Sequence, residues 1–87
     1  MKIYKTKVDD FAGLFYNPKS EILITVSGDM NVLVVNQRFD ISGLEEHEIN
    51  DKKYKKFEIA AEEYFDNKDS EIAKSKFEDA FNDLYKP

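Results

Sequence analysis

The 87-residue chain carries a formal net charge of −5 and contains no cysteine. Its length suits a single domain over residues 1–87, because two domains of half that size would each bury too little apolar surface. The missing cysteines exclude disulfides, thiolate metal sites and cysteine nucleophiles, and the acidic charge argues against direct binding of nucleic acid.

The first half of the chain contains apolar, β-branched segments that predict strands. Residues 3–8 carry lysines at alternate positions, which is typical of an edge strand. Residues 11–16 form a second extended segment, residues 21–26 give the strongest strand pattern, and residues 31–36 follow after a short loop. We therefore predict an antiparallel β-meander of three to four strands over about residues 2–41.

The loop between the two strongest strands predicts their register. Gly28 stands at the first central position of a two-residue type II′ turn. In that register Thr25 faces Val32 and Ile24 faces Leu33. Both faces of the sheet are then apolar. The second face either lies beneath the N-terminal strand or a loop, or serves as a dimer surface. The residues of this possible dimer face are Leu14, Leu23, Val32 and Val34.

The second half has the spacing of two amphipathic helices. Residues 43–48 lack an apolar stripe, so we expect a loop or a single helical turn there. Asn50 is the predicted N-cap of a helix over about 51–66, and Asp69 that of a second helix over about 70–85. Strands followed by amphipathic helices predict an α+β fold with two helices packed on one face of the sheet. The stripes expected to be buried are Tyr54, Phe57, Ala60, Ala61, Tyr64 and Phe65, then Ile72, Ala73, Phe77, Ala80, Phe81 and Leu84.

Acidic side chains on the two predicted helices form the most distinctive charge pattern. Glu58, Glu62 and Asp66 follow one another at i, i+4 and i+8, a like-charge ridge that costs local helix stability. Such a surface can imitate the phosphates of nucleic acid and occupy a basic groove of a partner protein. The alternative is a solvated face that keeps a small domain soluble. The predicted partner-binding residues are Glu58, Glu62, Glu63, Asp66, Asp69, Glu71, Glu78, Asp79 and Asp83.

Two further features carry weaker signals. Lys52, Lys53, Lys55 and Lys56 oppose the dipole of the first helix, and we interpret them as surface charge balanced by nearby acids. A phosphate site would need a glycine loop or interleaved aromatic residues, which are missing here. His47 is the only histidine and has no accompanying nucleophile or metal-ligand pattern. We therefore predict no catalytic residue, metal site or cofactor.

In size and charge the chain resembles small immunity proteins and phage-encoded inhibitors of bacterial defence, a resemblance of composition and not of motif. Our leading hypothesis is a small acidic cytoplasmic protein-binding module, not an enzyme, that inhibits a basic, nucleic-acid-handling partner protein. The alternative is a structural or assembly module that homodimerises through the second apolar face of its sheet. No segment approaches the ~20 apolar residues of a membrane-spanning helix, and the N-terminus is too charged for a signal peptide, so we expect no membrane partner.

Overall fold

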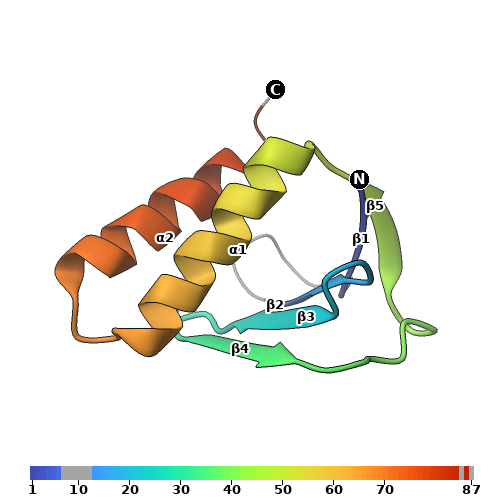
Figure 1. The fold of residues 1–87 in the computed structure, drawn as a ribbon, viewed down its shortest axis with the longest axis horizontal. Coiled ribbons are helices and arrows are strands. Elements are labelled where there is room, and N and C mark those ends of the chain that lie inside the picture. Colours follow the sequence, from blue (N-terminus) through green and yellow to red (C-terminus); the bar gives the residue numbers. More distant parts are fainter. Residues whose placement is uncertain (7–12, 85, 87) are drawn as a thin grey trace. The chain divides into compact units, whose positions relative to one another are not determined.

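The computed structural model describes residues 1–6, 13–84 and 86. It divides into two compact units, one of Lys2–Glu48 and one of Met1 with Ile49–Pro87. The first unit holds the described strands and the second holds the described helices, which confirms the α+β class (Figure 1). The predicted strand segments at 7–8 and 11–12 lie outside the described residues. A single domain over the whole chain remains a prediction.

The described strands form one five-stranded antiparallel sheet in the order β4-β3-β2-β1-β5. Four of them follow one another as a meander in which each strand lies beside the next, as predicted from the sequence. A fifth strand joins at the far edge and was not predicted. The strands are β1 (Lys2–Lys5), β2 (Gly13–Asn17), β3 (Ile22–Val26), β4 (Val32–Asn36) and β5 (Glu45–Glu48).

The strand β5 corrects the prediction of a loop or helical turn at residues 43–48. Glutamate is disfavoured in strands, so this segment has no local strand signal. Its conformation comes from pairing with β1, where Lys5 lies opposite Glu45 and opposite charges face each other across the ladder. The hydroxyl of Tyr4 also donates to the Glu46 carboxylate at 3.1 Å. As a result β1 lies inside the sheet and is not the edge strand that its lysines suggested.

The β3–β4 hairpin has a three-residue loop, so the predicted two-residue turn is wrong. The Ser27 N–H donates to the Asn31 carbonyl at 2.9 Å, and Met30 adopts a left-handed φ of 64°. This is the three-residue loop that ends in a left-handed residue. The side chains of Ser27 and Asp29 are hydrogen bonded and both accept from the Asn31 N–H, which stabilises this turn. The extra loop residue pairs Val26 with Val32, one position from the predicted register.

A shift of one residue moves every side chain of β4 to the opposite face. Leu14 and Leu23 do share the second face, since Leu14 lies opposite Thr25 and Tyr16 opposite Leu23. Val32 and Val34 lie on the first face, which is the side of the sheet that also carries their partners across the ladder, Val26 and Ile24. The predicted dimer face of Leu14, Leu23, Val32 and Val34 is therefore divided between two sides of the sheet. The second face instead carries Leu14, Tyr16, Leu23, Thr25, Leu33 and Val35.

The connection from β4 to β5 runs between opposite edges of the sheet and passes over the second face. Phe39 lies in this connection and packs on Tyr16, with ring centroids 6.0 Å apart. Tyr16 is consequently only 4% exposed, whereas Leu33 remains 46% exposed. A loop therefore covers part of the second face, which was one of the two arrangements expected from the sequence.

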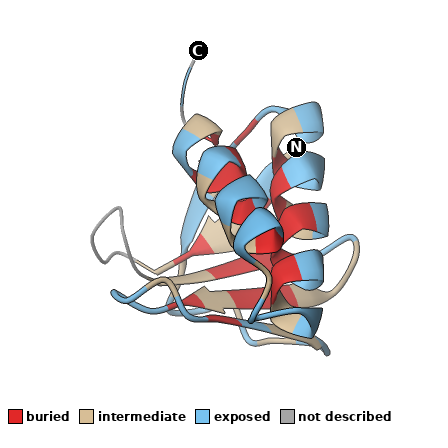
Figure 2. Cartoon of the chain, turned by 90° about the vertical axis from the view of Figure 1, so that its left-hand side faces the viewer, coloured by how far each residue is buried: buried red, intermediate tan, exposed pale blue. Residues whose placement is uncertain are grey.

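The two helices begin at side-chain caps. In α1 (Asp51–Asp66) the Asn50 side chain accepts from the Lys53 N–H, as predicted. In α2 (Glu71–Asp83) the cap is Ser70, which accepts from the Ala73 N–H, and not the predicted Asp69. Figure 2 shows buried residues along one side of each helix and exposed residues along the other. The two helix spans thus agree closely with the sequence-based ones.

An aromatic cluster holds α1 and α2 together. Phe57 lies 5.7 Å from both Phe77 and Phe81, measured between ring centroids, and Tyr64 stacks on Phe77 at 5.7 Å. Phe57 and Phe77 are fully buried. Burial of rings of this size contributes most of the packing energy of such a helix pair. The two helices therefore form a defined hairpin whose outward side can present a surface.

Candidate functional site

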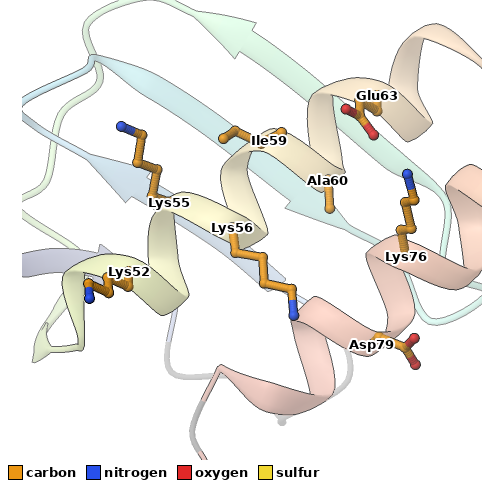
Figure 3. Close-up of a pocket in the computed structure, with 8 residues that line it drawn as sticks. All are labelled: Lys52, Lys55, Lys56, Ile59, Ala60, Glu63, Lys76 and Asp79. Atoms are coloured by element: carbon orange, nitrogen blue, oxygen red, sulfur yellow. The ribbon is translucent and has the colours of Figure 1, made fainter.

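A groove lies between α1 and α2 and has a volume of about 590 Å³. We call it the helix groove (Figure 3). Its residues are all in the helical unit. They are Lys52, Lys55, Lys56, Ile59, Ala60 and Glu63 of α1 with Lys76 and Asp79 of α2.

Helical spacing explains why these residues meet. Lys52, Lys56, Ile59 and Glu63 recur at steps of three or four, which places them on one side of α1. Ala60 is only 6% exposed and forms the floor, because its small side chain leaves space between the two helices. Ile59 is 48% exposed beside that floor. The groove therefore has an apolar bottom within a charged rim.

The rim is positively charged although the chain is acidic. Four lysines and two carboxylates leave the groove a net charge of +2, against −5 for the chain. In Figure 3 Lys56 reaches from α1 toward α2, and Lys76 reaches from α2 toward Glu63. Within residues 1–6, 13–84 and 86, no acidic group forms an ion pair with any of the four lysines. Their charges are available to a ligand.

A second, smaller depression continues the helix groove toward the α1–α2 turn. It has a volume of about 240 Å³ and shares Glu63 and Lys76 with the larger groove. Ile72 lines it and is 71% exposed, which contradicts its place in the predicted buried stripe. Each depression therefore carries one exposed isoleucine, Ile59 in the larger and Ile72 in the smaller.

The structure does not bring the nine predicted partner-binding acids into one group. Glu63 and Asp79 line the lysine-rich helix groove. With 3.6 residues per turn, Glu58 and Glu62 lie on the opposite flank of α1, and Glu71 and Glu78 on the flank of α2 away from the groove. The remaining predicted acids, Asp66, Asp69 and Asp83, line neither depression.

The lysine cluster is the feature whose importance the sequence interpretation missed. Of Lys52, Lys53, Lys55 and Lys56, Lys53 is bound by another described residue, since its Nζ donates to the carbonyl of Lys86. The other three join Lys76, which is 20 residues further along the chain than Lys56. Ile59 could have signalled the site, because it is a large apolar residue outside the buried stripe of α1.

His47 lies on β5 beside Glu45. Its Nε2 lies 3.6 Å from a Glu45 carboxylate oxygen. Strand alternation places the adjacent Glu46 and Glu48 on the other face of β5. Among the described residues there is no group of three or more histidine or acidic side chains arranged to hold a metal ion.

Comparison with protein-family models, curated proteins and solved structures finds no match to this chain. Neither of the helices within the described residues has the length and apolar character needed to cross a membrane. The helical hairpin thus presents a groove with an apolar floor, a cationic rim and exposed isoleucines.

Proposed function

We propose that the chain is a protein-interaction module whose recognition surface is the helix groove between α1 and α2. The observation that supports this is the combination of a groove of about 590 Å³, a half-exposed Ile59 at its apolar floor, and four lysines with no acidic partner among the described residues. Exposed apolar area with a charged rim commonly marks a protein-binding surface.

The chemistry of the groove favours an acidic amphipathic helix as its ligand. Two packed helices can seat a third in the furrow between them, with the apolar face of the incoming helix downward. The two connected depressions expose Ile59 and Ile72, which a small anion would leave uncovered and the apolar side of a helix can contact. Lys56 of α1 and Lys76 of α2 line the groove from different helices, where they can pair with carboxylates of the ligand.

The hypothesis of an acidic inhibitor on a basic partner stays a prediction. It requires the acidic side chains to act as one surface, whereas they occupy several flanks of the hairpin. Glu71 and Glu78 distinguish the two ideas, because they lie away from the helix groove. Reversing both to lysine should leave binding at the groove unchanged and should weaken capture by a basic partner.

The proposal is tested with a labelled synthetic peptide that forms an amphipathic helix with glutamates on its polar face. We expect measurable binding by fluorescence anisotropy at low salt, and at least about tenfold weaker binding to the variant Lys56→Glu with Lys76→Glu, a loss of about 1.4 kcal/mol. The matched control is Lys19→Glu with Lys68→Glu, which changes the net charge equally on exposed residues outside the groove. A peptide with lysines in place of the glutamates should not bind. Equal binding to both protein variants would contradict the proposal.

A further inference from the structure

The charges on the outer face of α1 run against the dipole of that helix. Its N-terminal half carries lysines and its C-terminal half carries acids, with no basic residue in the last turn. A helix favours the reverse order, because its N-terminus has a partial positive charge and its C-terminus a partial negative one. By outer face we mean the exposed residues Lys52, Lys55, Lys56, Ile59, Glu62, Glu63 and Asp66.

The first turn contains one acid that could offset the lysines, but it is engaged elsewhere. The carboxylate of Asp51 lies 2.8 Å from the amino group of Met1. The charge order on the outer face is therefore unfavourable within a single chain. It becomes favourable if a second helix runs in the opposite direction beside it.

On the outer face, lysines precede Ile59 and acids follow it at equal distances. The charges of this face are therefore complementary to those of the same face on an antiparallel copy of the helix. Lys52 and Asp66 lie seven residues before and after Ile59, and Lys56 and Glu62 lie three before and after it. Lys55 and Glu63, four residues to either side, complete the pattern. Each lysine has an acid at the same distance on the other side of the central residue.

We propose that α1 packs antiparallel against α1 of a second copy of the chain, about a twofold axis at Ile59. The inference deepens and rests on the proposed function, since it identifies the acidic amphipathic helix as the C-terminal half of α1 from another copy. Ile59 then meets its symmetry mate, and Lys52 of each chain faces Asp66 of the other. Lys56 then faces Glu63 and Lys55 faces Glu62, because the members of each pair lie on the same flank of the contact.

This arrangement removes the conflict with the helix dipole. The lysines of one chain lie beside the C-terminal, negative end of the partner helix, and the acids lie beside its N-terminal end. Each chain contributes three lysines and three acids, so the contact is neutral even though each chain carries −5. A twofold contact uses the same patch on both copies and closes as a dimer.

The contact is small, which sets the expected strength. The segment from Lys52 to Asp66 is about 21 Å long at ~1.5 Å per residue. One apolar side chain per copy at a single helix pair falls below the ~1,200 Å² of a stable interface. We therefore expect a weak dimer that forms at high protein concentration and low salt.

Sedimentation velocity of the native chain gives the first test. We expect a monomer–dimer equilibrium up to about 0.5 mM protein at low salt, with the dissociation constant rising at least about tenfold when salt reaches ~0.5 M, because ion pairs at the rim are screened. A chain that stays monomeric over this range at low salt overturns the inference.

Two charge-reversal variants give the second test. Lys52→Glu with Lys56→Glu, and Glu63→Lys with Asp66→Lys, each place like charges opposite one another in the homodimer. Each should be monomeric. An equimolar mixture restores every pair, so it should form a heterodimer. Both variants also give α1 the charge order that its dipole favours, so their thermal midpoints should not fall below that of the native chain.

The control Lys19→Glu with Lys68→Glu changes the net charge as much as the first variant and should dimerise like the native chain. Homodimers of either interface variant, or no gain on mixing, contradict the twofold contact. A native chain that is monomeric but binds the acidic peptide would overturn only the self-association. A chain that neither dimerises nor binds the peptide would overturn the proposed function as well.

Discussion

The helical unit and the sheet unit are determined over different distances along the chain. In the helical unit, Asn50 and Ser70 each cap a helix by accepting from the N–H three residues later. In the sheet unit, β5 depends on pairing with β1, whose residues lie 40 to 46 positions earlier in the sequence. The face of β4 depends on a single loop conformation at Met30. Interactions between residues close in the sequence therefore specify the helices. The sheet depends on strand pairing between residues far apart in the sequence and on the backbone conformation of one loop.

Among substitutions in the sheet unit, we expect the largest loss of stability at Gly13, the first residue of β2. Its φ of 148° is disfavoured for residues with a side chain, and an added Cβ would lie 2.7 Å from the Thr6 hydroxyl oxygen. That hydroxyl accepts from the Leu14 N–H, so displacing it also breaks a hydrogen bond. We expect Gly13→Ala to lower the free energy of unfolding by about 1–3 kcal/mol.

Urea denaturation followed by circular dichroism measures this loss. Gly43→Ala is the matched control, because nothing lies within 4 Å of the Cβ it would add. That control should change stability by no more than ~0.5 kcal/mol. Equal effects of the two alanines would show that the close approach at Gly13 is unimportant.

A smaller effect is expected at Met30, which sets the register of β4. Its φ of 64° is left-handed, a conformation that asparagine tolerates better than methionine. We expect Met30→Asn to raise the free energy of unfolding by up to ~1 kcal/mol. Met30→Ala keeps the left-handed strain and should give no gain. A loss of stability in Met30→Asn would contradict this account of the loop.

The helix boundaries were predictable because capping chemistry and apolar spacing are local. Asn50 and the stripe from Tyr54 to Tyr64 were enough to locate α1. The second stripe was wrong at its first residue. Ile72 is exposed because it lies on the outward side in the first turn of α2. Spacing alone did not show whether an apolar residue in the first turn of a helix would be buried or exposed.

The sheet faces were not predictable to the same extent. Gly28 in the loop suggested a two-residue turn, yet the hydrogen bonds of Ser27 and Asp29 stabilise a loop with one residue more. That single residue moved Val32 and Val34 to the other face. The strand at Glu45–Glu48 has no local signal, so only its partner strand reveals it.

The position of the helix groove was not predictable from the sequence. The sequence indicated a charged binding surface on the two helices and gave the acids the main role. The helix groove instead gathers Lys52, Lys55 and Lys56 with Lys76 from the other helix. No spacing rule connects residues on different helices before the hairpin geometry is known. The opposition of Lys52, Lys53, Lys55 and Lys56 to the helix dipole was visible from the sequence, where we interpreted these lysines as surface charge balanced by nearby acids.

The most direct measurement of the central claim uses the fact that the native chain contains no cysteine. Ile59→Cys places one thiol at the proposed twofold axis, and Ile72→Cys places one on the same hairpin at a more exposed site, 71% against 48%. A short bifunctional maleimide should cross-link Ile59→Cys into a covalent dimer faster than Ile72→Cys at low salt, and high salt should remove the difference. Equal or faster cross-linking of Ile72→Cys would contradict the antiparallel contact of α1 with its copy.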